Sequence, residues 1–113
     1  MVRVLFSDKV VDFINDFNSG LKIQMKKKFS KLKENPKLGD FVFGIGNIDC
    51  REIKVEGLRF FTICYRNQNF VLDLDEFKDI LKVVDLANKN KSKEQQKIID
   101  DIKNKVKILG MNI

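Results

Sequence analysis

Apolar residues at helical spacing in the first third of the chain predict two helices after a short strand. Residues 2–6 alternate like a strand, and Ser7 then offers a helix N-cap. Residues 10–17 carry apolar side chains three and four positions apart, so we expect the first helix there. Asn-Ser-Gly at residues 18–20 breaks it, and a second helix is predicted over residues 21–34, whose apolar positions are spaced by four, four and three. The two helices should form a helical hairpin.

The middle of the chain alternates between apolar and polar side chains, as strands do. Candidate strands lie at residues 41–45, 51–55, 58–65, 70–74 and 80–87. Residues 58–65 are apolar on both faces, which predicts a central strand, and Glu56-Gly57 before it predicts a tight turn. Residues 80–87 also fit a helix, because length alone does not settle so short an apolar run.

The chain closes with a predicted helix that begins at a Ser92–Gln95 capping box and stops at Gly110. The order of elements is β-α-α-β-β-β(-β)-α. It predicts one α+β domain over residues 1–113, with a mostly antiparallel four- to five-stranded sheet, an N-terminal helical hairpin and a C-terminal helix. We expect the helices on one face of the sheet and the other face partly free for a ligand.

Charge is unevenly distributed along the 113 residues, whose formal net charge is +6. Residues 21–37 hold seven lysines against one glutamate, and residues 87–113 hold seven lysines against three carboxylates. Residues 67–86 are acidic, with five carboxylates against two lysines. Two basic clusters of this size favour a polyanionic partner, nucleic acid first. The alternative is a lysine-rich surface that is only solvated.

Several kinds of chemistry are excluded by residue type. The chain has no histidine, and Cys50 and Cys64 are 14 positions apart without a CxxC motif. We therefore expect no metal, no cofactor and no histidine-activated nucleophile, and both cysteines read as core residues of strands. No apolar run approaches the ~18 residues of a membrane span. Residues 1–6 are too short for a signal peptide, so we expect a cytoplasmic protein with no membrane partner.

Short motifs accompany this order of elements. Glu52-Ile53-Lys54 stands on one strand, Leu58-Arg59-Phe60-Phe61 on the next, a lysine tract follows an apolar run at residues 83–93, and Lys97-Ile98-Ile99 begins the last helix. The arrangement resembles the RelE/ParE superfamily of toxins, in its HigB-like branch, where an "ELR" segment, a "YRI" segment and a lysine tract occupy these places. Lys54 replaces the arginine of the first motif, and the lysine tract lacks its usual proline.

The resemblance implies the toxin of a type II toxin–antitoxin system, an endoribonuclease that cuts mRNA on the ribosome and inhibits translation. Its partners would be a cognate antitoxin protein, the ribosome and mRNA. Without histidine, cleavage would depend on clustered cations, which depress one another's pKa and stabilise the phosphorane. The candidate catalytic residues are Lys54, Arg59, Lys89 and Lys91.

A second group of residues is predicted to hold RNA rather than cut it. Basic side chains there would contact phosphates, and Tyr65 would stack on a base, although it also suits a core position. The candidate RNA-binding residues are Lys22, Lys26, Lys27, Lys33, Arg51, Arg66 and Tyr65.

Other functions fit the same sequence. A ParE-like member of the superfamily would poison DNA gyrase by binding, without ribonuclease activity. A basic nucleic-acid-binding module would bind polyanions with a steep salt dependence and leave growth unaffected. A protein-interaction domain with solvated lysines would show no polyanion affinity at moderate salt.

Overall fold

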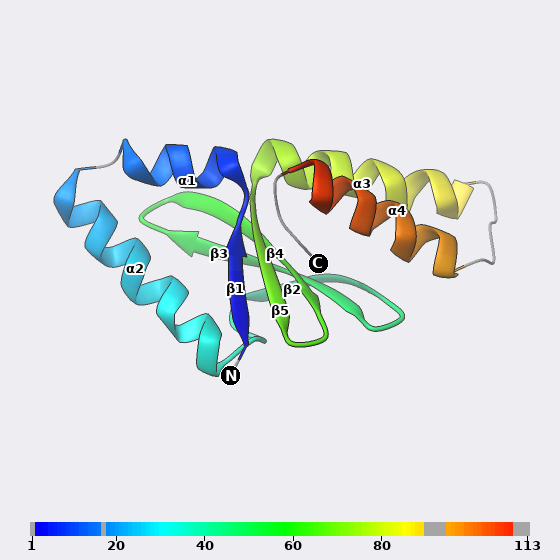
Figure 1. Cartoon of the computed structure of the whole chain (residues 1–113), viewed down its shortest axis with the longest axis horizontal. Coiled ribbons are helices and arrows are strands. Elements are labelled where there is room, and N and C mark those ends of the chain that lie inside the picture. Colours follow the sequence, from blue (N-terminus) through cyan, green and yellow to red (C-terminus); the bar gives the residue numbers. More distant parts are fainter. Residues whose placement is uncertain (1, 17, 90–94, 110–113) are drawn as a thin grey trace.

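Within the described residues, one five-stranded sheet is flanked by four helices (Figure 1). The computed structural model describes residues 2–16, 18–89 and 95–109. The strands are β1 (Arg3–Phe6), β2 (Asp40–Ile45), β3 (Ile48–Val55), β4 (Leu58–Tyr65) and β5 (Gln68–Asp73). The helices are α1 (Asp8–Asn15), α2 (Ser19–Glu34), α3 (Leu74–Lys89) and α4 (Gln95–Ile108). The predicted α+β class is therefore confirmed.

The sheet is mixed, with the strand order β1-β5-β4-β3-β2. β1 pairs with β5 in parallel, and the other three pairs are antiparallel. The predicted central position of residues 58–65 is confirmed, because β4 lies in the middle of the order. The predicted turn is also confirmed: Glu56 and Gly57 have φ angles of 50° and 81° and join β3 to β4. Two positive φ values suit the two-residue turns of tight hairpins.

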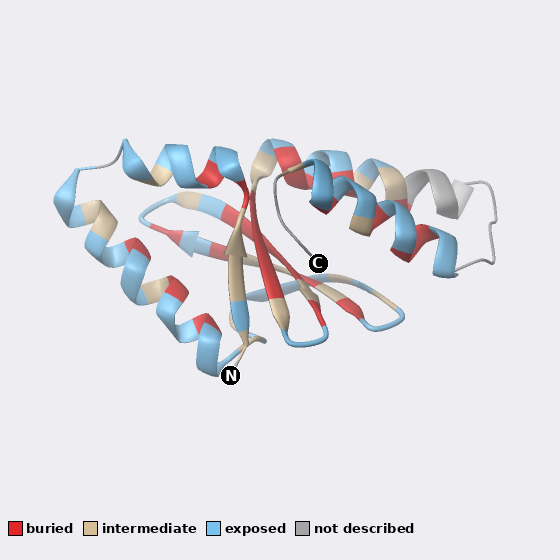
Figure 2. Ribbon diagram, in the orientation of Figure 1, coloured by how far each residue is buried: buried red, intermediate tan, exposed pale blue. Residues whose placement is uncertain are grey.

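Helices cover both faces of the sheet, so the expectation that they lie on one face is wrong. α1 and α2 pack on one face, where Phe29 and Leu32 contact residues such as Phe60. α3 and α4 pack on the other, where Ile80 and Ile102 join a second core with Phe61, Ile63, Phe70 and Leu72. β4 and β5 are buried along most of their length (Figure 2). Strands that are apolar on both faces need a helical layer on each side, which explains the arrangement.

Of the strand and the helix that both fit residues 80–87, the helix is confirmed, because these residues belong to α3. A reciprocal cap starts the helix: Asp73 Oδ1 accepts a hydrogen bond from the Glu76 N–H at 2.9 Å, and Glu76 Oε1 accepts one from the Asp73 N–H at 3.0 Å. Phe77, Ile80 and Val84 then follow at helical spacing and are buried. The single predicted C-terminal helix is thus preceded by a second helix on the same face.

A buried serine joins the beginnings of α1 and α3. Ser7 Oγ accepts a hydrogen bond from the Val10 N–H at 3.2 Å, which confirms Ser7 as the N-cap of α1. The same hydroxyl donates to Glu76 Oε1 at 2.7 Å. Ser7 and Glu76 are 0% and 6% exposed. The two helical pairs on opposite faces of the sheet therefore share one polar junction.

Candidate nucleic-acid interface

The β3–β4 turn brings two of the predicted catalytic cations together. Lys54 and Arg59 lie directly opposite each other in the strand register. The carboxylate of Glu52 lies between them: Oε2 is 2.8 Å from Arg59 Nη2, and Oε1 is 3.6 Å from Lys54 Nζ. We call Glu52, Lys54 and Arg59 the hairpin cluster.

The hairpin cluster occupies an open end of an otherwise covered face. Alternate residues of a strand share a face, so Glu52, Lys54 and Arg59 project on the side where Cys50 and Phe61 pack in the core of α3 and α4. The side chains of Lys54 and Arg59 are nevertheless 65% and 49% exposed, while that of Glu52 is only 14% exposed. The cations are therefore accessible to a ligand, and the carboxylate is sheltered beneath them.

Electrostatics keep this carboxylate charged. The hydrogen bond from Arg59 is the largest effect and lowers the pKa of Glu52. Burial, the second largest, opposes it, and the charges of Arg59 and Lys54 lower the pKa further. Glu52 in turn raises the pKa of Arg59. The guanidinium carbon of Arg59 is 5.4 Å from the centre of the Phe61 ring, which stacks on Phe77 at 3.8 Å. Arg59 is thus oriented by a carboxylate and an aromatic face.

Lysines of α2 form a second positive surface, which meets the cluster only at the end of β3 because α2 packs on the opposite face of the sheet. The apolar stripe that includes Met25, Phe29 and Leu32 faces the sheet, so the lysines lie on the other sides of the helix. A shallow groove of about 430 Å³ lies between α2 and the end of β3. Its basic lining consists of Lys27, Lys28, Lys31 and Lys54. We call it the lysine groove, and it joins a predicted catalytic residue to a predicted RNA-binding residue.

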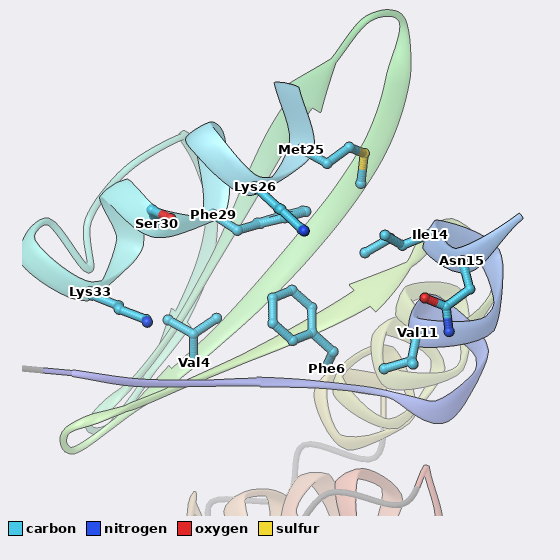
Figure 3. A pocket seen from close by; sticks show the side chains of 10 residues that line it. All are labelled: Val4, Phe6, Val11, Ile14, Asn15, Met25, Lys26, Phe29, Ser30 and Lys33. Atoms are coloured by element: carbon cyan, nitrogen blue, oxygen red, sulfur yellow. The ribbon is translucent and has the colours of Figure 1, made fainter. Parts of the chain in front are cut away.

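Two other predicted RNA-binding lysines of α2 line a different cavity. Lys26 and Lys33 line a mainly apolar cavity of about 440 Å³ between β1, α1 and α2, which we call the apolar cleft. Both ammonium groups point from α2 toward β1, across the side chains of Val4 and Phe6 (Figure 3). Lys22 lies in the first turns of the same helix and is partly exposed. The lysines of α2 therefore serve two separate surfaces.

The remaining predicted RNA-binding residues do not join the hairpin cluster. Arg51 lies opposite Thr62, with its guanidinium carbon 5.5 Å from the Phe41 ring centre, and its Nε is buried without a hydrogen-bond partner among the described residues. Tyr65 ends β4 and Arg66 follows it, so both lie about 20 Å or more from Arg59 at about 3.3 Å per residue.

Two cationic side chains lie close to the ring of Tyr65. The Lys103 ammonium is 4.4 Å from the ring centre, and the Arg66 guanidinium carbon is 5.1 Å from it. Interaction with Lys103 is the main cause that lowers the pKa of Tyr65. Tyr65 is 6% exposed, so its ring belongs to the core of α3 and α4 rather than to an open stacking surface.

The other two predicted catalytic lysines are not brought to the hairpin cluster by any described contact. Lys89 is the last residue of α3, which runs away from the β3–β4 turn, and its side chain lies outside the described part of the chain (Figure 1). Lys91 lies outside the described residues altogether, as does Ser92 of the predicted capping box.

Sequence reasoning missed Glu52 as a member of the site. The signal was present, because Glu52 and Lys54 are two positions apart on one strand and therefore share a face. A two-residue turn at Glu56-Gly57 places Arg59 opposite Lys54, so the carboxylate had two cations within reach.

Comparison with known proteins found no match to this chain. The chain matches no family model, no curated protein and no solved structure. In the described part of the chain, no three His, Cys, Asp or Glu side chains are grouped so that they could hold a metal ion. None of the helices, over the residues described, has the length and apolar character needed to cross a membrane.

Proposed function

We propose that the chain is an endoribonuclease that cleaves mRNA on the ribosome, as the toxin of a type II toxin–antitoxin system. The observation that carries the proposal is the hairpin cluster, in which one sheltered carboxylate lies between two accessible cations. RNA cleavage by its own 2′-hydroxyl needs a proton acceptor, cations for the phosphorane and a proton for the leaving oxygen. The three side chains are of the types that supply these functions.

In the proposed reaction, Glu52 takes the proton from the 2′-hydroxyl, and the 2′-oxygen bonds to the adjacent phosphorus. Arg59 donates hydrogen bonds to the non-bridging oxygens as charge develops on them. The bond between phosphorus and the 5′-oxygen then breaks, and that oxygen leaves with a proton from the Lys54 ammonium. The products are a 2′,3′-cyclic phosphate and a 5′-hydroxyl. The lowered pKa leaves the Glu52 carboxylate unprotonated at neutral pH and able to accept the proton, as a weaker base than an ordinary glutamate.

The lysine groove supports an extended polyanionic substrate. Lys27, Lys28 and Lys31 meet Lys54 at the end of β3, so a backbone that passes around this end of the sheet from the hairpin cluster to α2 would find a basic surface for its flanking phosphates. Such contacts position a backbone without reading its sequence. The ribosome would hold the mRNA in line for the reaction.

The apolar cleft supports an antitoxin partner. β1 is an edge strand of the sheet, and the cleft beside it combines apolar side chains with Lys26 and Lys33. An extended segment with apolar and acidic residues would suit this surface, because its backbone would pair with β1 and its carboxylates would meet the lysines. A net charge of +6 favours an acidic partner in the same way.

A non-catalytic protein that binds nucleic acid, or a gyrase-binding toxin, is the second candidate. The observation that favours it is that both cations of the hairpin cluster already pair with Glu52, as they would in a purely structural ion pair. In that case the lysine groove would bind phosphates and no RNA would be cut.

Controlled induction in a bacterial host, with mapping of 5′ ends on a translated reporter mRNA, tests the proposal. We expect growth arrest and new cuts that disappear when translation is blocked. Arg59→Ala should abolish the cuts, and Arg3→Ala, which removes an exposed arginine of β1, should leave them unchanged. Arrest without cuts would support a binding toxin, and normal growth with intact mRNA from soluble protein would contradict the toxin proposal.

A further inference from the structure

The outer edge of β1 carries backbone groups that point away from the sheet. β1 is one of the two edge strands and pairs with β5 in parallel. The N–H groups of Arg3 and Ser7 donate to carbonyls in or just before β5, at 2.8 Å and 3.2 Å. Only alternate residues of a strand bond to a given parallel neighbour, so the N–H and C=O groups of Val4 and Phe6 point to the outer edge.

Val2 shows that the outward groups of β1 can pair with another segment. Its N–H has the same orientation as that of Val4 and donates to the carbonyl of Lys33, at the end of α2, at 3.1 Å. α2 therefore closes the edge of the sheet at Val2. Among the residues that the structure describes, no segment bonds to the outward groups of Val4 and Phe6, so an added strand has access to them.

The apolar cleft lies directly beside this open edge. Val4 and Phe6 extend their side chains into it, and the Phe6 ring meets the Phe29 ring edge-on at 5.3 Å. Val11 on the α1 wall is 40% exposed although it is apolar. Side chains directly opposite each other on paired strands share a face. A strand added to β1 would therefore place every second side chain in the cleft.

β1 lacks the features that usually protect an edge strand. The other edge strand, β2, has an irregular register between Phe41 and Phe43, and such a bulge hinders pairing with a further strand. β1 is regular over its four residues and holds neither proline nor lysine. A regular edge next to an apolar cleft is the arrangement with which strand-adding domains bind extended peptides.

Charge discriminates between the possible occupants of this edge. Lys26 and Lys33 point from α2 toward β1 across the cleft (Figure 3), and neither makes an ion pair within the part of the chain that the structure describes. Arg3 is exposed on β1 itself. A second copy of the chain would bring these cations against its own, whereas an acidic segment would neutralise them.

We propose that the outer edge of β1 binds an extended segment of a partner protein as an added strand. Alternate residues of this segment face the apolar cleft, with apolar side chains in the middle and acidic ones next to Lys26 and Lys33. The proposal deepens the partner assignment of the proposed function and rests on it only for the identity of the partner as an antitoxin. The hairpin cluster lies on the opposite face of the sheet, so the segment anchors the partner without covering the cluster.

Peptides selected on the immobilised protein from a phage library of random decapeptides provide the probe. We expect an enriched consensus with apolar residues at alternate positions and with aspartate or glutamate at the ends of that series. A fluorescein-labelled consensus peptide should bind Lys26→Glu/Lys33→Glu at least about tenfold more weakly than the wild type. The matched control, Lys37→Glu/Lys78→Glu, reverses two exposed lysines outside the cleft and should keep the affinity within about twofold.

Pairing with β1 has two readouts of its own. Methylation of the peptide nitrogens at one set of alternate residues removes the N–H groups that face β1 and should abolish binding. Methylation at the other set, whose N–H groups face solvent, should be tolerated. In the protein, the amide protons of Val4 and Phe6 should exchange at least about tenfold more slowly in the complex.

Four results would overturn the proposal: no enriched consensus, equal binding by Lys26→Glu/Lys33→Glu, the same effect of both methylation patterns, or unchanged exchange at Val4 and Phe6. A dimer of the free protein in sedimentation that the peptide dissociates would instead assign the edge to a second copy of this chain. No RNA enters these measurements. A negative result therefore leaves the ribonuclease standing, and a failure to cleave mRNA leaves the added strand standing.

Discussion

Replacing Ser7 by alanine should destabilise the whole fold, because one hydroxyl holds two helix beginnings. The change removes the N-cap of α1, where Ser7 Oγ accepts from the Val10 N–H, at a cost of about 1 kcal/mol. It also removes the 2.7 Å hydrogen bond to the buried Glu76 carboxylate, and a bond to a charged group contributes about 1.5–3 kcal/mol. Glu76 keeps the donor at the Asp73 N–H, so its charge is not left without a partner. Together these losses predict a decrease of about 3 kcal/mol in the free energy of unfolding.

Urea denaturation measures this decrease. With a slope of about 1.5 kcal/mol per M, the midpoint of Ser7→Ala should lie about 2 M below that of the wild type. Ser19→Ala is the matched control, because Ser19 is exposed in the first turn of α2 and Asn18 provides the cap there. A shift in Ser7→Ala no larger than that of Ser19→Ala would refute the proposed junction between α1 and α3.

Three further outcomes follow from the structure. Because its pKa is lowered on folding, Glu52 stabilises the protein above the ordinary pKa of a glutamate and loses this effect as the pH falls; urea titrations should therefore show a stability gap between wild type and Glu52→Gln at pH 7 that closes near pH 3. Burial raises the pKa of Cys50 to about 12 and also raises that of Cys64, so both thiols should react slowly with a disulfide reagent at pH 8, with the half-buried Cys64 first; fast modification of Cys50 in the native protein would contradict this. Lys31→Ala should lower the slope of log affinity for RNA against log salt concentration by about one, and Lys78→Ala, on the exposed side of α3, should not change it.

Local patterns predicted the middle of the fold and part of the site. The predicted turn at Glu56-Gly57 has two residues, and the hairpin it closes places Lys54 opposite Arg59, both of them predicted catalytic residues. The apolar side chains on both faces of residues 58–65 predicted a central strand. Only a strand that has a neighbouring strand on each edge and a helical layer on each face buries all of them. Ser7 was readable as a cap because it precedes a run at helical spacing.

Features that depend on contacts distant in sequence were not predicted. The parallel pairing of β1 with β5 joins segments more than 60 positions apart, and nothing in the sequence of either strand indicates which strand it pairs with. A local signal was overlooked as well: Asp73 and Glu76, three positions apart, form the reciprocal cap that decides residues 80–87 in favour of the helix over the strand. The cavity between α1, residues 57–60 and residues 73–75 arises from three segments, and no single motif in the sequence describes it.

The most direct test of the central claim is cleavage of mRNA on purified bacterial ribosomes, with chemical identification of the new ends. The account predicts a 2′,3′-cyclic phosphate and a 5′-hydroxyl with the wild-type protein and with Arg3→Ala. Glu52→Gln should still bind but cleave at least about 100-fold more slowly, since it lacks the proton acceptor. Cleavage by Glu52→Gln at the wild-type rate, or no cleavage by the folded wild-type protein on programmed ribosomes, would contradict the assignment of the hairpin cluster as a ribonuclease site.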